Sequence, residues 1–277
     1  MTSSNPSPGE RVTLITGAAS GTGRALSERL AARGERVVAA DIRGDALAWT
    51  GEHPNVVAAV ADVSTPEGNR GMVEVALTRF GRLDALALNA AVMSLGGTIE
   101  EMPLEYLDRI LAVNFTGAVL GIRAATPVMR AQGGGAIVVT SALAGQRGIP
   151  KLWAYSASKA AVINLVLSAA LELGPQNIRV NTVSPGPIAG TAATAALPDT
   201  APQYYAELAR AVPLHRWGDP GEIAAAIDFL LSPAASYING AILPVDGGAL
   251  VPLPWYSPDH SRFDRDTAGD TAPVSHR

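Results

Sequence analysis

The sequence predicts an α/β protein built on a single doubly wound parallel sheet of about seven strands, with helices on both faces. Short runs rich in Val and Ile alternate along the chain with segments of helical period, which is the pattern of repeated βαβ units. The runs alternate little between apolar and polar residues, as strands do when helices cover both of their faces. In such a sheet the carboxyl ends of the strands form the edge where ligands bind.

The expected strands are short apolar runs that end at polar or turn-forming residues. They are residues 11–16 (RVTLIT), 36–41 (RVVAAD), 55–62 (NVVAAVAD), 83–89 (LDALALN), 136–141 (AIVVTS), 178–184 (IRVNTVS) and 241–246 (AILPVD). The expected helices lie between them, where apolar residues recur at helical spacing. They span residues 22–33, 66–80, 103–113 continuing towards 131, 153–173 and 219–231.

The length and composition are those of one folded domain with extensions at both ends. The chain has 277 residues, of which 48% are hydrophobic and 17% are charged, so a large core is possible. We expect residues 1–9 to be a disordered leader, residues 10–248 the folded domain and residues 249–277 a C-terminal extension. Residues 187–215 are rich in Ala, Pro and Thr and lack a strand, which predicts a lid over a ligand site.

The composition also excludes several functions. The formal net charge of −4 offers no basic surface for a nucleic acid or an anionic membrane. The chain has no cysteine, which rules out disulfides, thiolate chemistry and cysteine-bound metals, and no metal site is expected. The N-terminus has no signal-peptide pattern, and the most apolar segment, residues 160–173, is too short to cross a bilayer. We therefore expect a cytoplasmic protein that acts on a small molecule.

The first strand runs directly into the sequence TGAASGTG, residues 16–23, and then into a helix. Glycines allow a tight turn and a close approach of a pyrophosphate to backbone N–H groups, and the helix N-terminus adds a positive dipole end. Because a strand, the glycines and a helix all occur in order, the motif predicts a Rossmann-type nucleotide site. Its expected contacts are Gly17, Ser20, Gly21, Thr22 and Gly23.

Asp41 ends the second predicted strand, 24 positions after Gly17. A carboxylate there accepts hydrogen bonds from the adenosine ribose hydroxyls and repels a 2′-phosphate, so NAD is favoured over NADP. Arg43 would weaken this preference unless it is a solvated surface residue. Ile42 is a further expected cofactor contact, and the pair Asp62 and Val63 is expected near the adenine, with a capping role for Asp62 as the alternative.

Tyr155 and Lys159 are four positions apart on a predicted helix, so both project from one face. A phenol has an ordinary pKa of about 10, and a neighbouring ammonium would lower it enough for proton transfer to or from an alcohol oxygen. The spacing alone is common on surface helices. It gains weight here because the pair follows a nucleotide-binding half and a strand that ends at residue 141.

Over about residues 10–248 the chain resembles the short-chain dehydrogenase/reductase family. The resemblance rests on TGAASGTG (16–23), DV (62–63), LNAA (88–91), Asn114 in VNFTG, YSASK (155–159), NTVSPGPI (181–188) and VDGG (245–248). It implies hydride transfer between a nicotinamide and a carbinol carbon, with Tyr155 as acid/base, Lys159 as its partner on the ribose and Asn114 holding a relay water. It adds these residues to the expected cofactor site: Asn89, Ala90, Tyr155, Lys159, Pro185, Gly186, Ile188 and Thr191.

Three positions depart from the family pattern. Ala91 stands where glycine is usual, and one extra residue separates Ile188 from Thr191. The third departure concerns the family's serine, thirteen residues before the tyrosine, where this chain has Ala142. The nearest hydroxyl is on Ser141, whose side chain should face away from the substrate because neighbours in a strand alternate. Ser141 is therefore a catalytic candidate only if the strand end bulges, and Ser94 is a second source of a hydroxyl.

The expected substrate pocket is apolar and aromatic, which favours a neutral, hydrophobic, cyclic secondary alcohol or ketone. Its expected lining is Met93, Ser94, Ala142, Leu143, Trp153, Pro187, Tyr204 and Tyr205. The helix 153–173 is apolar on more than one face, which predicts a homo-oligomer, either a dimer or a homotetramer. Two alternatives stay open: a cofactor-binding protein with weak or no redox turnover, and non-redox dehydration or epimerisation at the same site.

Overall fold

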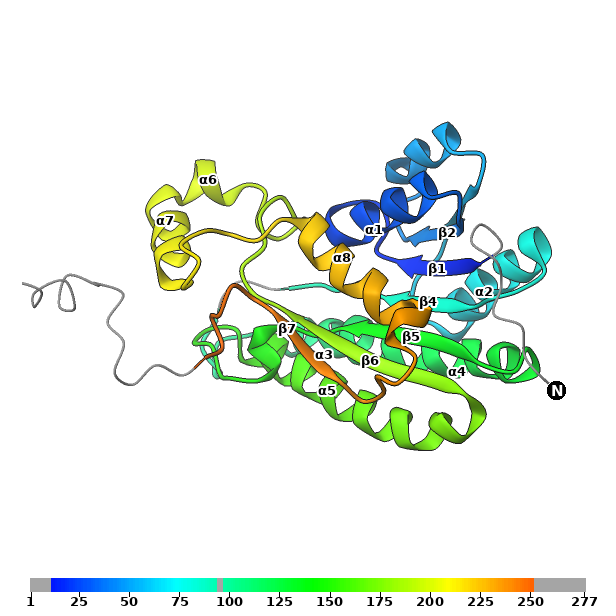
Figure 1. The fold of residues 1–277 in the computed structure, drawn as a ribbon. Coiled ribbons are helices and arrows are strands. Elements are labelled where there is room, and N and C mark those ends of the chain that lie inside the picture. Colours follow the sequence, from blue (N-terminus) through cyan, green and yellow to red (C-terminus); the bar gives the residue numbers. More distant parts are fainter. Residues whose placement is uncertain (1–10, 94–96, 252–277) are drawn as a thin grey trace, which may run out of the picture.

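The structure, a computed structural model, describes residues 11–93 and 97–251 (Figure 1). The predicted leader, Ser94 and nearly all of the C-terminal extension lie outside these residues. Within them, seven strands form one parallel sheet in the order β3-β2-β1-β4-β5-β6-β7, which confirms the predicted fold class. The strands are β1 Val12–Thr16, β2 Arg36–Asp41, β3 Val56–Val60, β4 Ala85–Leu88, β5 Gly135–Thr140, β6 Ile178–Pro185 and β7 Ile242–Val245.

Helices cover both faces of this sheet (Figure 1). Helices α1 and α8 pack on one face, and α2, α4 and α5 pack on the other, each through its own cluster of buried apolar side chains. The α-helices are α1 Gly21–Ala32, α2 Pro66–Phe80, α3 Leu104–Leu111, α4 Gly117–Ala131, α5 Trp153–Leu173, α6 Leu197–Thr200, α7 Pro202–Ala211 and α8 Pro220–Leu231. Short 3₁₀ turns are η1 Asp45–Glu52, η3 Leu143–Gly145, η4 Gly174–Gln176 and η5 Pro233–Ala235.

Two segments differ from the sequence-based expectation. The helix expected from residue 103 towards 131 is divided into α3 and α4 by a π-helical turn, η2, at Ala112–Thr116. The segment 187–215 contains no named strand, as expected, but it carries the two short helices α6 and α7. Both begin with Pro in the first turn, which suits a helix start because proline lacks the N–H that would be unpaired there.

Two helical stretches of the described chain are long and apolar enough to cross a membrane by length and composition alone: Leu104–Ala131 and Trp153–Gln176. We expected the apolar segment 160–173 to be too short to cross a bilayer. The second stretch corrects this expectation of length, because the helix extends beyond that segment at both ends. Helix α4 in the first stretch and helix α5 in the second pack on the sheet, and 44% and 39% of the apolar windows of the two stretches are buried. They are therefore explained as core helices.

A charge cluster joins α1 to α8 at the end of the sheet away from the glycine-rich turn. Asp228, whose side chain is 6% exposed, accepts hydrogen bonds from Arg29 at 2.8 Å and from Arg33 at 2.7 Å. Burial acts to raise the pKa of Asp228, but these two arginines outweigh it and hold the pKa below its ordinary value. The carboxylate therefore stabilises the fold in its charged form.

We predict that Asp228→Asn lowers the free energy of unfolding by about 2 kcal/mol at neutral pH, less than for a fully buried pair because the arginines are half exposed. The contribution is present above the unfolded-state pKa of about 4 and is lost as the pH falls through the lower folded-state pKa. Urea unfolding at neutral and at strongly acidic pH measures it. Glu28→Gln, which breaks the exposed pair with Arg24, is the control and should change stability by less than about 0.5 kcal/mol. An equal effect of the two substitutions would contradict the prediction.

Candidate active site

The glycine-rich turn connects β1 to α1 at the carboxyl edge of the sheet. Gly17 has a φ of +72°, and a Cβ on Gly23 would lie 2.2 Å from the Gly17 carbonyl oxygen, so this approach requires glycine. Ser20 is the N-cap of α1 but makes no side-chain cap, and the first turn contains no acidic residue. The N–H groups of Gly21, Thr22 and Gly23 can therefore receive an anion, which fits a dinucleotide pyrophosphate.

Asp41 closes β2 beside this turn. Its Oδ2 accepts a hydrogen bond from Ala19 N at 3.1 Å, and its Oδ1 accepts one from Arg43 N at 3.0 Å. The guanidinium of Arg43 folds back over the same place, 3.5 Å from Asp41 Oδ1, and donates to Ser20 Oγ at 3.1 Å. Arg43 is therefore a neighbour of the expected ribose position, with its side chain 51% exposed. Ile42 is 63% exposed between them.

Asp62 and Val63 follow β3. Asp62 Oδ1 accepts hydrogen bonds from Ser64 N at 2.8 Å and from Ser64 Oγ at 2.7 Å, so this carboxylate holds the turn that precedes α2. This capping arrangement is the alternative that the sequence left open for Asp62. Val63 instead contributes to the wall of the cavity described below.

The loop after β4 is fixed to the glycine-rich turn by a residue that the sequence analysis did not single out. Thr16 Oγ1 accepts hydrogen bonds from Asn89 N at 3.0 Å and from Ala90 N at 3.1 Å. Asn89 Oδ1 in turn accepts from Thr140 Oγ1 at 3.3 Å, so the ends of β1, β4 and β5 are tied together. Ala91, in place of the usual glycine, has a negative φ and an exposed side chain, so its methyl group fits without strain.

The segment after β6 lies against the glycine-rich turn. Gly186 N donates to Val245 O at 3.1 Å, which keeps this segment at the end of β7. Thr194 Oγ1 donates to Ile188 O at 2.6 Å and lies 2.8 Å from Thr191 Oγ1. A Cβ on Gly21 would meet Thr191 Cα at 3.5 Å. The extra residue between positions 188 and 191 is thus absorbed in a hydrogen-bonded turn.

Tyr155 and Lys159 lie on one face of α5. Lys159 is 2% exposed, its Nζ donates to Thr140 O at 2.8 Å, and the same Nζ lies 5.7 Å from the centroid of the Tyr155 ring. Burial raises the pKa of Tyr155 to about 12 and lowers the pKa of Lys159 to about 8. The sequence led us to expect the ammonium to lower the pKa of the phenol. In this site burial acts on the phenol in the opposite direction and has the larger effect.

Asn114 lies in the π-helical turn and faces the same place. Its Oδ1 accepts from Val92 N at 2.8 Å, and its Nδ2 donates to Val92 O at 3.0 Å and to Ser158 Oγ at 3.1 Å. Ser158 Oγ donates to Tyr155 O at 2.7 Å. The amide is 3% exposed, so these bonds fix its orientation and connect the loop after β4 to α5. Ser158 is a second residue that the sequence analysis missed.

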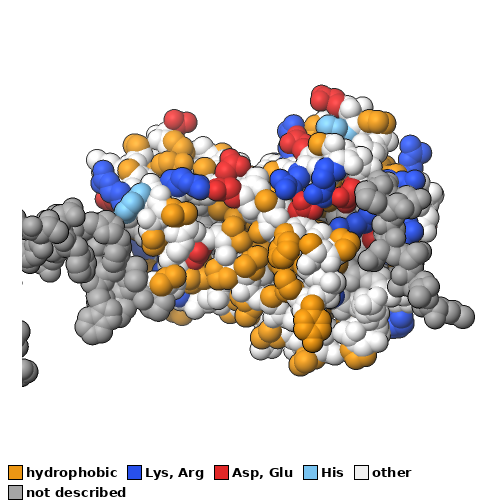
Figure 2. Space-filling model, in the orientation of Figure 1, with side chains coloured by type: hydrophobic (Ala, Val, Ile, Leu, Met, Phe, Trp, Pro, Cys, Tyr) orange, Lys and Arg blue, Asp and Glu red, His pale blue; other side chains and the backbone are white. Residues whose placement is uncertain are grey.

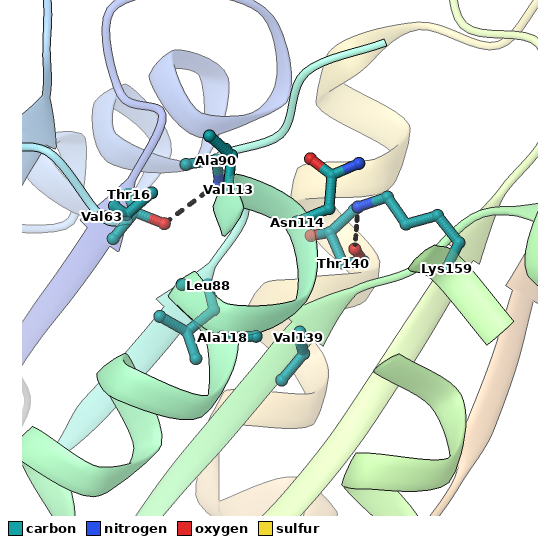
Figure 3. A pocket seen from close by; sticks show the side chains of 11 residues that line it. Thr16, Val63, Leu88, Ala90, Val113, Asn114, Ala118, Val139, Thr140 and Lys159 are labelled. Carbon is teal, nitrogen blue, oxygen red and sulfur yellow. Dashed lines mark hydrogen bonds between the residues drawn. The ribbon is translucent and has the colours of Figure 1, made fainter. Parts of the chain in front are cut away.

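A small cavity joins these groups (Figure 3). Asn114, Thr140 and Lys159 lie together on one side of it, and Thr16 with Ala90 lies on the other. Apart from Lys159, no described residue of its wall is titratable, and the described residues contain no cluster suited to a metal ion. The wall consists of Thr16, Val63, Leu88, Ala90, Val113, Asn114, Gly117, Ala118, Val139, Thr140 and Lys159.

Ser141 and Ala142 follow β5 with extended backbone. Ser141 is 2% exposed, and its Oγ donates to Lys159 O at 2.9 Å, inside the protein. Ala142 has a φ of −165° and a ψ of 162°, so its Cβ points to the side opposite to Ser141. The methyl group of Ala142 and the hydroxyl of Ser141 therefore lie on opposite sides of the backbone.

The residues expected to line the substrate pocket are only partly brought together. Leu143 is buried, while Met93, Trp153 and Pro187 are half-buried at the same edge of the sheet. Trp153 packs against the cluster of Met102, Ile110 and Ala154 that joins α3 to α5. In the predicted lid, the ring of Tyr205 stacks on Trp217 at 4.4 Å, and Tyr204 is 49% exposed.

Comparison with known proteins bears on this site. Residues 17–249 match the family described as enoyl-(acyl carrier protein) reductase. Cis-4-hydroxycyclohexanecarboxylate dehydrogenase of Sinomonas cyclohexanicum is 38% identical over 245 residues, covering 86% of this chain and 96% of the relative. Cyclohexanol dehydrogenase of Acinetobacter sp. (strain SE19) is 35% identical over 242 residues, covering 86% of this chain and 94% of the relative.

Solved structures show the same likeness. The structure of 3-ketoacyl-(acyl-carrier-protein) reductase from Brucella melitensis complexed with NADH has a TM-score of 0.81 and 32% identity, covering 87% of this chain and 98% of that one. The chain therefore belongs to the short-chain dehydrogenase/reductase family, as its motifs led us to expect. Members of this family bind nicotinamide cofactors, and the relatives are dehydrogenases and reductases of small molecules, which supports an oxidoreductase activity for this chain.

Proposed function

We propose that the protein is an NAD-dependent oxidoreductase that interconverts a hydrophobic cyclic secondary alcohol and its ketone. The observation that carries the proposal is that Asn114, Lys159 and Thr16 all line one small cavity, directly beside the glycine-rich turn. A protein that only bound a nucleotide would not need a buried lysine next to a half-buried phenol, since burying a lysine is costly.

The residues of the glycine-rich turn fit a nicotinamide dinucleotide. The uncapped first turn of α1 would hold the pyrophosphate, and Asp41 would hold the adenosine ribose. Pro185, Gly186, Ile188 and Thr191 would border the nicotinamide end. When bound, the cofactor supplies the hydride donor or acceptor, and the protein supplies position and proton transfer.

Tyr155 would exchange a proton with the alcohol or carbonyl oxygen. With its pKa raised to about 12 by burial, the phenol is protonated at neutral pH, which suits it to donate a proton during ketone reduction. In the oxidation direction it must first lose that proton, so alcohol oxidation should accelerate as the pH rises. While it is protonated, Lys159 would place a positive charge beside the phenol and so favour loss of the phenol proton, and Asn114 would hold a water in the cavity.

The apolar side chains near this edge favour a hydrophobic substrate. Leu143 and Pro187 border the site, and residues 187–215 would form its lid with α6 and α7. The names of the two relatives, a cyclohexanol dehydrogenase and a hydroxycyclohexanecarboxylate dehydrogenase, support a ring alcohol or ketone. The cofactor-binding and dehydration or epimerisation alternatives would leave NADH unconsumed.

The proposal is tested by measuring the absorbance of NADH. With a panel of cyclic ketones its consumption is followed, and with the matching alcohols and NAD its formation is followed. Turnover of at least one ring substrate, with the alcohol as the only carbon product of reduction, is the expected result. If NADH binds but no panel member gives turnover, the binding-protein alternative gains support. If product forms from a hydroxy compound without any change in NADH, the non-redox alternative is correct.

The choice between NAD and NADP depends on Asp41 in this proposal. Asp41→Asn keeps an oxygen that can accept from Ala19 N but removes the charge that repels a 2′-phosphate, and it releases Arg43 to meet that phosphate. We predict that the ratio of kcat/KM for NADPH to that for NADH rises about tenfold or more. Steady-state kinetics with both cofactors measures the ratio. In Arg43→Gln, the control, the preference for NADH should hold or increase. An unchanged ratio in Asp41→Asn would contradict the assignment.

We further propose a cytoplasmic homo-oligomer, a dimer or a homotetramer. Apolar side chains gather on the face that carries β7 and the end of α8 (Figure 2), where Phe229 is 43% and Tyr237 103% exposed. A second apolar surface lies on α5, where Leu167 is 39% and Leu171 82% exposed. Exposed apolar surfaces of this kind commonly mark contacts between protein subunits.

A further inference from the structure

Both the side-chain ammonium and the backbone carbonyl of Lys159 are hydrogen-bonded to residues at the end of β5. Its Nζ donates to Thr140 O at 2.8 Å, and its backbone carbonyl accepts from Ser141 Oγ at 2.9 Å. Ser141 is itself fixed by the sheet, because its N–H donates to Val183 O at 2.9 Å. Thr140, the last residue of β5, therefore holds the lysine through a carbonyl, and Ser141, the next residue, holds it through a hydroxyl.

The turn after Ala142 closes over this contact. A Cβ on Gly145 would lie 2.7 Å from the carbonyl carbon and the carbonyl oxygen of Lys159, and 2.8 Å from Ser141 Oγ. The backbone of η3 is therefore packed directly against the carbonyl to which Ser141 donates, and only glycine allows this approach. Ser141 and Lys159 are each 2% exposed, so water does not compete for the hydrogen bond.

We propose that Ser141 is a positioning residue for Lys159, and that its hydroxyl serves the lysine instead of the substrate. The hydroxyl fixes the backbone of Lys159 against the sheet, and this keeps the ammonium at Thr140 O, 5.7 Å from the centroid of the Tyr155 ring. The ring of Tyr155 lies beside the ammonium, and apart from Lys159 itself no described residue of the cavity wall is titratable. We call these two hydrogen bonds, Lys159 Nζ to Thr140 O and Ser141 Oγ to Lys159 O, the lysine clamp. The role of the lysine clamp in catalysis rests on the function proposed above, but its role in positioning Lys159 does not.

The chain offers an unusually direct test, because it contains only two lysines, Lys151 and Lys159. Protein labelled with ¹⁵N at the lysine side chains gives one signal from each, and Lys151, which is exposed, is the internal reference. A pH titration of the Lys159 signal reports its pKa without any cofactor or substrate. The wild-type value should lie near 8, because burial lowers the pKa of this lysine.

In Ser141→Ala we expect the pKa of Lys159 to rise by about one pH unit towards its ordinary value, because a freed ammonium is better hydrated. Gly145→Ala, which keeps the hydroxyl but forces η3 away from Lys159, should produce a rise in the same direction. Ser141→Cys, nearly the same size with a weak donor, should lie between Ser141→Ala and the wild type. The control is Ser156→Ala on the same helix, since Ser156 Oγ is buried with no hydrogen-bond partner among the described residues.

The inference is overturned if Ser141→Ala lowers only the melting temperature and leaves the Lys159 titration equal to that of Ser156→Ala. If Ser141→Ala fails to fold, Ser141→Cys and Gly145→Ala decide between these outcomes. Parallel assays of NADH turnover separate the two proposals. If the wild-type protein is inactive but the pKa of Lys159 rises in Ser141→Ala, the proposed function is refuted and the lysine clamp is supported. If the wild-type protein is active but the pKa of Lys159 does not change in Ser141→Ala, the proposed function is supported and the lysine clamp is refuted.

Discussion

Replacing Tyr155 with Phe should lower kcat for both oxidation and reduction about 10³-fold, the largest loss that we expect from one substitution. The substitution removes one oxygen atom and leaves the ring, so the packing of α5 beside Lys159 is kept. The described wall of the cavity contains no phenol, imidazole or carboxylate, and its one titratable group, Lys159, is bound to Thr140 O, so we expect no efficient substitute for the proton transfer.

The pH dependence separates a catalytic role for this tyrosine from a structural one. Because burial raises the pKa of Tyr155 to about 12, the wild-type rate of alcohol oxidation should rise through the alkaline range. The residual rate of Tyr155→Phe should be flat there. Tyr106→Phe is the matched control, since that tyrosine lies 49% exposed on α3 and has no proposed role in the site. NADH titration should show that both variants bind the cofactor. Full turnover in Tyr155→Phe would refute the proposed mechanism.

The fold could be predicted from the sequence because its signals are local. Each βαβ unit has its own apolar run and its own helical period, and the seven predicted strands all appear within one or two residues of their expected bounds. The turn of residues 16–23 was equally clear, since its glycines are required by a positive φ at Gly17 and a close approach at Gly23. In these places the local sequence and the tertiary structure favour the same conformation.

The missed features depend on contacts that no side-chain pattern encodes. Thr140 binds the ammonium of Lys159 through its backbone carbonyl, an atom that every residue has. The π-helical turn at Asn114 is held by Val92, 22 positions earlier in the chain, so helical periodicity cannot reveal it. The helices α6 and α7 are only 4 and 10 residues long, and each has a Pro in its first turn, so their periodic signal is weak.

Ala142→Ser should raise kcat about 10²-fold in the best ring substrate, by restoring a hydroxyl that can hold the reacting oxygen. The backbone at Ala142 is extended, with φ −165° and ψ 162°, so serine fits without strain, and this position is the N-cap of η3, where serine is favoured. The side chain would leave the strand on the side opposite to Ser141, whose own hydroxyl is committed to Lys159 O.

The control for this gain is Ala142→Cys, which adds similar bulk with a much weaker donor and should raise kcat far less. The gain should appear in kcat more than in KM, because the added hydrogen bond strengthens as charge develops on the oxygen in the transition state. Steady-state kinetics of both variants in both directions measures this difference. An unchanged or lower kcat in Ala142→Ser would mean that another donor already holds the reacting oxygen. The alanine would then be a feature of a complete site, and the missing hydroxyl would not limit the rate.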